Sequence, residues 1–284
     1  MKRKVLRLVS GVPTSDGAGV KLTRVIGQPR LEELDPFLML DEFGTDNPGD
    51  YIAGFPEHPH RGFETVTYML DGRMRHRDNH GHEGVLGPGS VQWMTAGRGI
   101  VHSEMPEQQE GRMRGLQLWL NLPARDKMTA PRYQEFGPEQ IPLAAVAPGV
   151  RVRVIAGQVA GLTGPITQPA TDPLYLDIEL EPGVRFMHEL PVEHAAFLFV
   201  LEGQVAVMGE EPEVAVSAHQ LAVLGSGAEL ELAGGRPDPG ATRSRVVLIA
   251  GRPLREPVAR YGPFVMNTRD ELVRAFEDFQ QGRL

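Results

Sequence analysis

The chain has 284 residues, 41% of them hydrophobic and 23% charged, and this ordinary globular composition excludes an intrinsically disordered protein. Its 29 basic and 37 acidic side chains give a net charge of −8, which argues against direct binding to nucleic acid. The absence of cysteine excludes disulfides, thiolate metal sites, iron–sulfur clusters and a cysteine nucleophile.

The N-terminus carries basic residues but no apolar region long enough for a signal peptide. The longest apolar run, residues 195–201, is far too short to span a membrane. We therefore expect a cytoplasmic monomer that does not bind membranes. Glycine and proline, with 33 and 24 residues, punctuate short apolar runs, and this pattern favours an all-β protein.

The first half of the chain reads as a series of short strands. Residues 5–9 and 20–26 flank a turn cluster at 15–19 and predict an opening hairpin. A later strand ends on Asp71 and Gly72, a dipeptide typical of hairpin turns. Together these signals predict a barrel or sandwich. The further strands expected are residues 36–43, 65–70, 90–97 and 116–122.

The second half of the chain repeats features of the first. A proline-rich connection over 123–149 separates them, and beyond it residues 196–203 parallel 65–72 while 220–225 parallel 90–95. We therefore predict two domains, residues 1–135 and 136–284.

The chain closes with one predicted helix. Thr268 and Glu271 form a capping-box pattern, and apolar residues follow at helical spacing up to Phe279. We expect the apolar face of this helix to cover a barrel mouth or a domain interface, rather than to bind a partner.

Four side chains on two predicted strands suggest a metal site. Residues two apart on a strand leave the same face, so His58 and His60 form one pair, and His102 and Glu104 form another. A strand, a turn and a second strand separate the pairs, which is the distance a barrel needs to bring them together. The alternative is that His58 and His60 are polar loop residues, with His102 and Glu104 paired to each other.

Three imidazoles and one carboxylate suit a first-row divalent metal: iron, manganese, nickel, copper, cobalt or zinc. Such an ion keeps positive charge and open positions, so the site is expected to be catalytic rather than structural. Pro59 stiffens the backbone between the first two histidines. Glu64 is a candidate hydrogen-bond partner for one ring, with an exposed strand position as the alternative.

The repeat predicts a metal site in the first half alone. Matching glycines and turns between the halves aligns Glu189 and Pro191 with the first histidine pair, and Leu232 and Gly234 with the second pair. Most of these side chains cannot ligate a metal. The second half does contain His188, His194 and His219, but this alignment places them off register, so no second metal is expected.

Long motifs resemble the pirin family of bicupin proteins. They are residues 54–64, 93–106, 115–119 and 261–268, and the likeness extends over essentially the whole chain. The resemblance implies two antiparallel cupin barrels with one metal in the N-terminal barrel. It assigns the ligands to His58, His60, His102 and Glu104, implies iron(II) as the metal, and implies a degenerate second cupin.

The resemblance leaves two functions open. One is a quercetin 2,3-dioxygenase activity, in which the metal-dependent enzyme opens the central ring of a flavonol with O2 and releases carbon monoxide. Glu104 would then take the proton of the substrate hydroxyl, and Phe43, Phe55 and Gln117 are candidates for lining the substrate pocket. The other is a non-enzymatic redox-sensing regulator that binds a transcription factor or metabolic enzyme, with the basic cluster at 73–77 as the contact.

Overall fold

The computed structural model describes residues 1–209, 212–236, 240 and 242–284, and their contacts define two compact units. The first unit comprises residues 12–138 and 254–284, and the second comprises residues 1–11 and 139–253. The division predicted from the sequence kept each half contiguous. In the structure the first eleven residues belong with the second half of the chain, and residues 254–284 belong with the first half.

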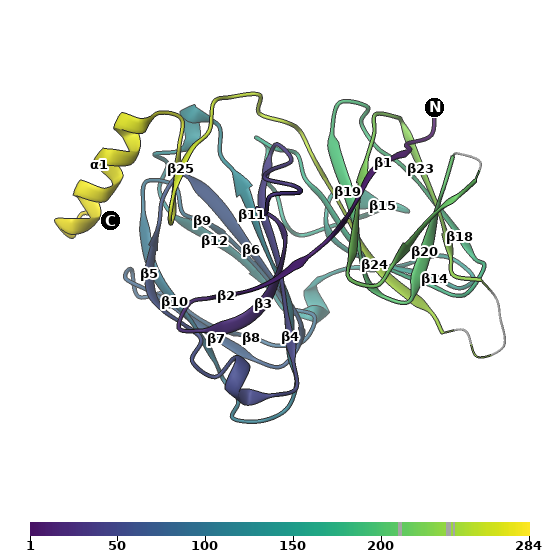
Figure 1. Cartoon of the computed structure of the whole chain (residues 1–284), viewed down its shortest axis with the longest axis horizontal. Helices are drawn as coiled ribbons and strands as arrows, with labels where there is room; N and C mark the ends of the chain where they lie inside the picture. Colours follow the sequence, from purple (N-terminus) through teal and green to yellow (C-terminus); the bar gives the residue numbers. More distant parts are fainter. Residues whose placement is uncertain (210–211, 237–239, 241) are drawn as a thin grey trace. The chain divides into compact units, whose positions relative to one another are not determined.

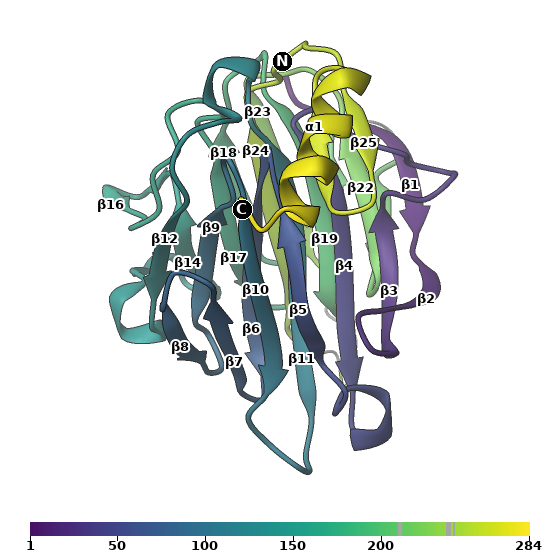
Figure 2. The same ribbon diagram turned by 90° about the vertical axis from the view of Figure 1, so that its left-hand side faces the viewer.

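The first unit is built from a seven-stranded and a four-stranded antiparallel sheet (Figure 1). The order of the large sheet is β12-β9-β6-β11-β4-β3-β2, and that of the small sheet is β5-β10-β7-β8, which faces the viewer in Figure 2. The strands are β2 (Val12–Asp16), β3 (Val20–Ile26), β4 (Phe37–Thr45), β5 (Phe55–His60), β6 (Phe63–Asp71), β7 (Met74–Asp78), β8 (Glu83–Leu86), β9 (Val91–Thr95), β10 (Ile100–Pro106), β11 (Met113–Asn121), β12 (Arg132–Phe136), β25 (Ala259–Tyr261) and β26 (Phe264–Met266).

The second unit has the same two-sheet construction. Its large sheet has the order β1-β22-β19-β24-β17-β14-β13, and its small sheet has the order β18-β23-β20-β21. The strands are β1 (Val5–Ser10), β13 (Leu143–Ala147), β14 (Val150–Ala156), β15 (Gln158–Val159), β16 (Leu162–Thr163), β17 (Leu174–Leu180), β18 (Arg185–Glu189), β19 (Ala195–Glu202), β20 (Gln204–Met208), β21 (Val214–Ser217), β22 (Gln220–Leu224), β23 (Glu229–Gly234) and β24 (Ser244–Gly251).

The two strand orders correspond position by position, so the predicted internal repeat is present in the sheet topology. β6 and β19 occupy the same place in their large sheets, and β5 and β18 the same place in their small sheets. β1 fills in the second unit the edge position that β12 fills in the first. The all-β prediction with two cupin barrels and one C-terminal helix is confirmed.

Several local predictions need correction. The turn near residue 17 is real, but it joins β2 to β3, while residues 5–9 pair with β22 instead. β1 extends to Ser10, so Gly11 is the one residue between it and β2, which lies in a different sheet. The turn at Gly72 makes no hairpin, because β6 and β7 lie in different sheets of the unit. The predicted connection over 123–149 contains β12 and β13.

The predicted C-terminal helix is confirmed as α1 (Arg269–Gln280), with both hydrogen bonds of the capping box between Thr268 and Glu271. Figures 1 and 2 both show it beside β25 of the first unit. Leu272 and Ala275 are buried in a cluster with Phe264 of β26. Short 3-10 turns are η1 (Pro48–Asp50), η2 (Ala124–Asp126) and η3 (Pro138–Gln140).

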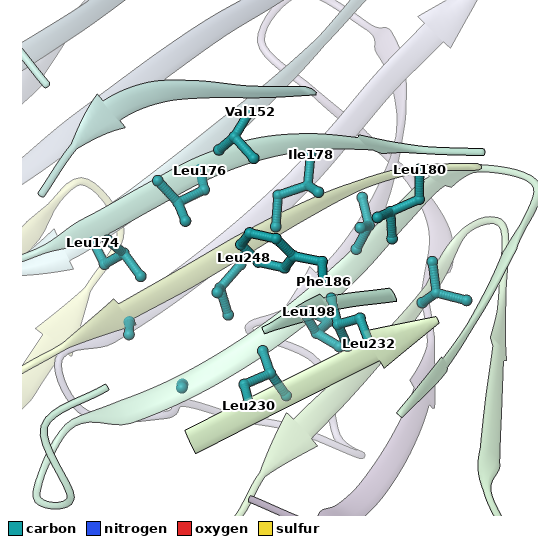
Figure 3. Close-up of a cluster of buried hydrophobic side chains, with 14 of the residues drawn as sticks. Val152, Leu174, Leu176, Ile178, Leu180, Phe186, Leu198, Leu230, Leu232 and Leu248 are labelled. Atoms are coloured by element: carbon teal, nitrogen blue, oxygen red, sulfur yellow. The ribbon is translucent and has the colours of Figure 1, made fainter. Parts of the chain in front are cut away.

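The interior of the second unit is apolar. Leucine, isoleucine, valine and phenylalanine side chains from both of its sheets form one continuous buried cluster. Figure 3 shows part of this cluster, with Phe186, Leu198 and Leu232 directed toward one another. One apolar cluster of the first unit includes Phe43, Met69 and Met113. Buried polar side chains, among them Thr67 and Gln92, also lie in the first unit.

Candidate metal centre

Three histidines converge inside the first unit. His58 of β5 stands directly opposite His102 of β10, and cross-strand partners direct their side chains to the same face. His60 lies two residues further along β5 and shares that face. The ring centres of His58 are 4.7 Å from His60 and 4.4 Å from His102, and His60 is 5.0 Å from His102. One nitrogen from each ring lies within 4.8 Å of the other two, a spacing that could hold a metal ion.

A β-bulge in β5 aims the first of these rings. Glu104 pairs with Phe55, whereas His102 pairs with His58, so β5 contains one residue more than β10 between the two pairs. Pro56 lies in the bulge, where its missing N–H breaks no ladder bond. The Pro56 carbonyl accepts a hydrogen bond from His58 Nδ1 at 2.8 Å, which leaves Nε2 free to ligate.

Burial keeps the other two rings neutral. His60 and His102 are 4% and 1% exposed, and this burial lowers the pKa of both imidazoles well below the usual value, with further lowering by the neighbouring histidines. Neutral imidazole is the form that binds metals. His60 Nδ1 and both ring nitrogens of His102 have no hydrogen-bond partner. Buried polar atoms are normally satisfied, so these nitrogens fit a divalent ion.

Glu104 lies in the same cavity but outside the set of mutually close ligand atoms. Its Oε1 is 3.0 Å from Thr67 Oγ1, which is also 2.6 Å from Gln117 Oε1. A hydroxyl has a single proton, so turning the Gln117 amide gives a consistent chain in which Gln117 donates to Thr67 and Thr67 donates to Glu104. Burial raises the pKa of Glu104, while His58 and the Thr67 hydroxyl oppose the rise.

The histidines open into a cavity of about 740 Å³, a size usual for small organic ligands. All three residues predicted to contact substrate, Phe43, Phe55 and Gln117, line it. Their individual roles remain predictions. Trp119, two residues from Gln117 on β11, lines the same wall, as the alternation of that strand predicts.

Sequence reasoning missed the contribution of the C-terminal segment. Arg260, Gly262 and Pro263 line the cavity, although more than a hundred residues separate them from β11 and β12. The Pro263 carbonyl also bonds the ring of His60. The motif at residues 261–268 was recognisable, but strand patterns alone carried no signal for its place in the first unit.

Two other predicted candidates lie elsewhere. Glu64 accepts a hydrogen bond from Thr95 at 2.6 Å. It is three residues from Thr67 on β6, so the two side chains leave opposite faces of the strand and Glu64 points away from the cavity. In the basic cluster, Arg75 forms ion pairs with Glu83 and Glu107. His76 of that cluster is buried inside the unit against Glu135, at 2.6 Å. Arg75 and His76 are therefore engaged within the unit, while Arg73 and Arg77 are exposed.

The equivalent positions of the second unit hold mainly leucine. Leu230 pairs with His188 as His102 pairs with His58, and Leu232 stands opposite Val207 as Glu104 stands opposite His76. The sequence alignment of the repeat was therefore off by one or two residues, because the connections differ in length. His188 is in register after all; it stacks on Phe186, pairs with Leu230 and lines a pocket of about 580 Å³ with Glu189 and His194.

Two cupin barrels, one with a histidine cluster opening into a cavity, define a bicupin protein with a candidate metal centre. Profiles of two families match the chain, Pirin over residues 19–120 and the Pirin C-terminal cupin domain over residues 175–284. The chain belongs to the pirin family.

Individual relatives agree with this assignment. A Pseudomonas aeruginosa protein provisionally named as a quercetin 2,3-dioxygenase is 54% identical, covering 99% of this chain and 98% of that protein. Human pirin is 44% identical, covering 99% and 93%. The crystal structure of a quercetin 2,3-dioxygenase from Acinetobacter baumannii matches with a TM-score of 0.89 and 33% identity, covering 100% and 98%.

No helix in the described parts of the chain is both long enough and apolar enough to cross a membrane. The predictions of a cytoplasmic location and a monomeric state stay predictions.

Proposed function

We propose that the protein is a metal-dependent dioxygenase that opens the central ring of flavonols such as quercetin with O2 and releases carbon monoxide. The observation that supports it most is the three-histidine cluster at one wall of a cavity lined by aromatic side chains. The relatives named as quercetin dioxygenases point in the same direction. His58, His60, His102 and Glu104 are the proposed ligands, and iron(II) is the proposed metal.

Bound in this cluster, a divalent ion would supply positive charge that favours an anionic oxygen ligand. The residues of the chain would do the remaining work. Glu104 is the carboxylate placed to accept the proton of the flavonol hydroxyl, and the raised pKa of this buried group suits a base. Thr67 holds the carboxylate at Oε1 and so sets its direction.

The cavity walls would orient the flavonol rings and exclude water. Phe43, Phe55 and Trp119 offer flat apolar surfaces. Gln117 offers a polar amide, which is linked to Glu104 by the hydroxyl of Thr67. Trp119 also packs on Phe63 at 4.2 Å between ring centres, which fixes the position of the indole behind His60. A planar substrate between these walls would present its oxygen atoms to the histidine cluster.

The test is an aerobic assay on protein reconstituted with iron(II), with parallel samples carrying manganese, nickel, copper, cobalt or zinc. Elemental analysis gives the metal content of each sample. Consumption of quercetin and O2 together with carbon monoxide release is the expected result. Glu104→Gln should lower turnover strongly. A fully loaded protein that leaves quercetin unchanged with every metal would contradict the proposal.

The regulatory alternative lacks a comparable structural observation. Within its proposed contact surface at 73–77, Arg75 is ion-paired and His76 is buried, which leaves Arg73 and Arg77 exposed. The dioxygenase is therefore the function that the described residues support better.

A further inference from the structure

Arg260 of β25 lines the cavity and its side chain is exposed. Its Cζ atom is 4.8 Å from the centre of the Trp119 ring, a cation–π contact. Nη1 donates to the Leu38 carbonyl at 3.1 Å, and Nη2 lies 3.8 Å from the sulfur of Met39. These contacts fix the plane of the guanidinium.

None of these partners is negatively charged. Within the part of the chain that the structure describes, no carboxylate oxygen lies within 4.0 Å of the Arg260 side chain. A guanidinium has five N–H donors, and the two contacts described above use one each at Nη1 and Nη2. An arginine held in place without a counter-ion is suited to bidentate binding of an oxyanion.

The neighbouring arginine shows the contrast. Arg24 also lines the cavity, but it bonds both oxygens of Asp41 at 2.9 and 2.7 Å and one oxygen of Asp16 at 3.1 Å. The two acids of this wall are therefore engaged by Arg24. Burial lowers the pKa of Arg260 and the charge of Arg24 lowers it further, while Asp41, Glu33 and Asp16 oppose this shift from beyond ion-pair distance.

The position of Arg260 relative to the histidines sets the shape of the ligand. The centre of the Trp119 ring is 5.3 Å from the ring centre of His60 and 4.8 Å from Cζ of Arg260, and all three residues line one cavity. The guanidinium and the His60 ring are therefore at most about 10 Å apart, the sum of these two distances. An aromatic ligand of two rings with an anionic group at one end is long enough to contact both.

We propose that Arg260 is a specificity-determining residue that binds an oxyanion, a carboxylate or an ionised phenol, at one end of an aromatic substrate whose other end faces His58, His60 and His102. This inference names the substrate class of the proposed metal site. It rests on the proposed function only for the end of the substrate that faces the histidines. The oxyanion contact itself needs neither metal nor turnover.

Binding of two matched ligands tests it. The full-length protein, loaded with metal and again after treatment with EDTA, is titrated by calorimetry with 4-biphenylcarboxylate and with 4-biphenylcarboxamide. The two have the same shape and differ in charge. Charge-assisted hydrogen bonds should make the carboxylate bind about 10- to 100-fold more tightly in both samples. Quenching of tryptophan fluorescence in a Trp93→Phe background, where Trp119 is the remaining tryptophan of the sequence, reports binding at the intended wall.

Variants assign the effect to one side chain. Arg260→Gln should remove the preference for the carboxylate, and Arg260→Lys should retain part of it, because the charge stays while the bidentate geometry is lost. Arg125→Gln, at an exposed arginine of the same unit, should keep the full preference. Thermal melting curves check that each variant is folded.

Equal affinity for both ligands in the unaltered protein, no binding of either, or an undiminished preference in Arg260→Gln would each overturn the inference. Failure of the dioxygenase proposal looks different. In that case quercetin is not consumed, while the charge preference and its loss in Arg260→Gln persist in the EDTA-treated protein.

Discussion

The two units share one strand topology but use their interiors differently. Where the first unit places His58 opposite His102, the second places His188 opposite Leu230. The second unit has an apolar cluster and, beside His188 and His194, a pocket of about 580 Å³, whereas the cavity of the first unit opens beside three histidines whose nitrogens lie close together. A cupin barrel therefore does not specify a site by itself, and a few substitutions on two strands decide whether the interior is a core or a chemical centre.

The largest effect that would sharpen this comparison is expected for the histidines of the first unit. His60→Ala should remove most bound metal and lower quercetin turnover by about a thousand-fold or more, since a metal supplies several kcal/mol of transition-state stabilisation. Elemental analysis and the oxygen assay measure both quantities. His188→Ala in the second unit is the matched control and should keep metal and activity; an equal loss in both variants would break the comparison.

A substitution in the apolar cluster of the second unit should lower stability and leave metal binding unchanged. Leu232→Ala removes a fully buried side chain from the apolar cluster and should cost about 2 to 5 kcal/mol of unfolding free energy. Urea denaturation followed by circular dichroism measures it. Metal content per folded molecule should stay unchanged. A Leu232→Ala protein that unfolds as the unaltered chain does would show that this interior is not the packed core described.

A smaller effect concerns the buried ammonium of Lys127 in the first unit. It donates to the carbonyls of Gly62 and Val265 and to Asn121, at 2.7 to 3.0 Å, but burial still lowers its pKa from 10.5 to about 8. The folded state then binds fewer protons than the unfolded state above pH 8, so stability should rise with pH, by about 2 kcal/mol between pH 8 and 10.

Urea denaturation at several pH values measures this slope, and Lys127→Met should abolish it. The window ends near pH 10 because burial raises the pKa of Tyr133 and Tyr175, whose ionisation in the unfolded state opposes the trend. A flat profile in the unaltered protein would mean that the three oxygen acceptors offset the burial of Lys127 completely.

The smallest expected effect is at the helix cap of the first unit. Thr268→Ala removes the side chain that accepts from the Glu271 amide and should cost about 1 kcal/mol. Thermal denaturation detects this change. Thr268→Ser keeps the acceptor and should restore most of the loss; similar melting temperatures for Ala and Ser would argue that the cap contributes little.

The sequence predicted those parts of the molecule that depend on local pattern. Strand alternation placed His58 with His60, and the capping box located α1. The turn residues also marked real chain reversals. What a turn cannot indicate is the sheet that follows it, so Gly72 was assigned to a hairpin although it passes the chain from one sheet to the other.

Long-range placement was beyond local pattern. The register of β18 and β23 depends on loop lengths that differ between the repeats, and this difference displaced the alignment of His188 and Leu230. Thr67 offered no signal in sequence, because its importance comes from its contact with Glu104. Arg260 reaches the cavity because residues 254–284 return to the first unit, after residues 139–253 have contributed to the second unit.

That return has a consequence for biosynthesis. Arg260 and Pro263 are translated more than a hundred residues after the last strand of the small sheet that carries the histidines. At about 5 to 20 residues per second, the ribosome needs several seconds or more to deliver them. The nascent histidine cluster is therefore open to solvent on one side during that interval, and an ion acquired early would be enclosed only when the final hairpin emerges.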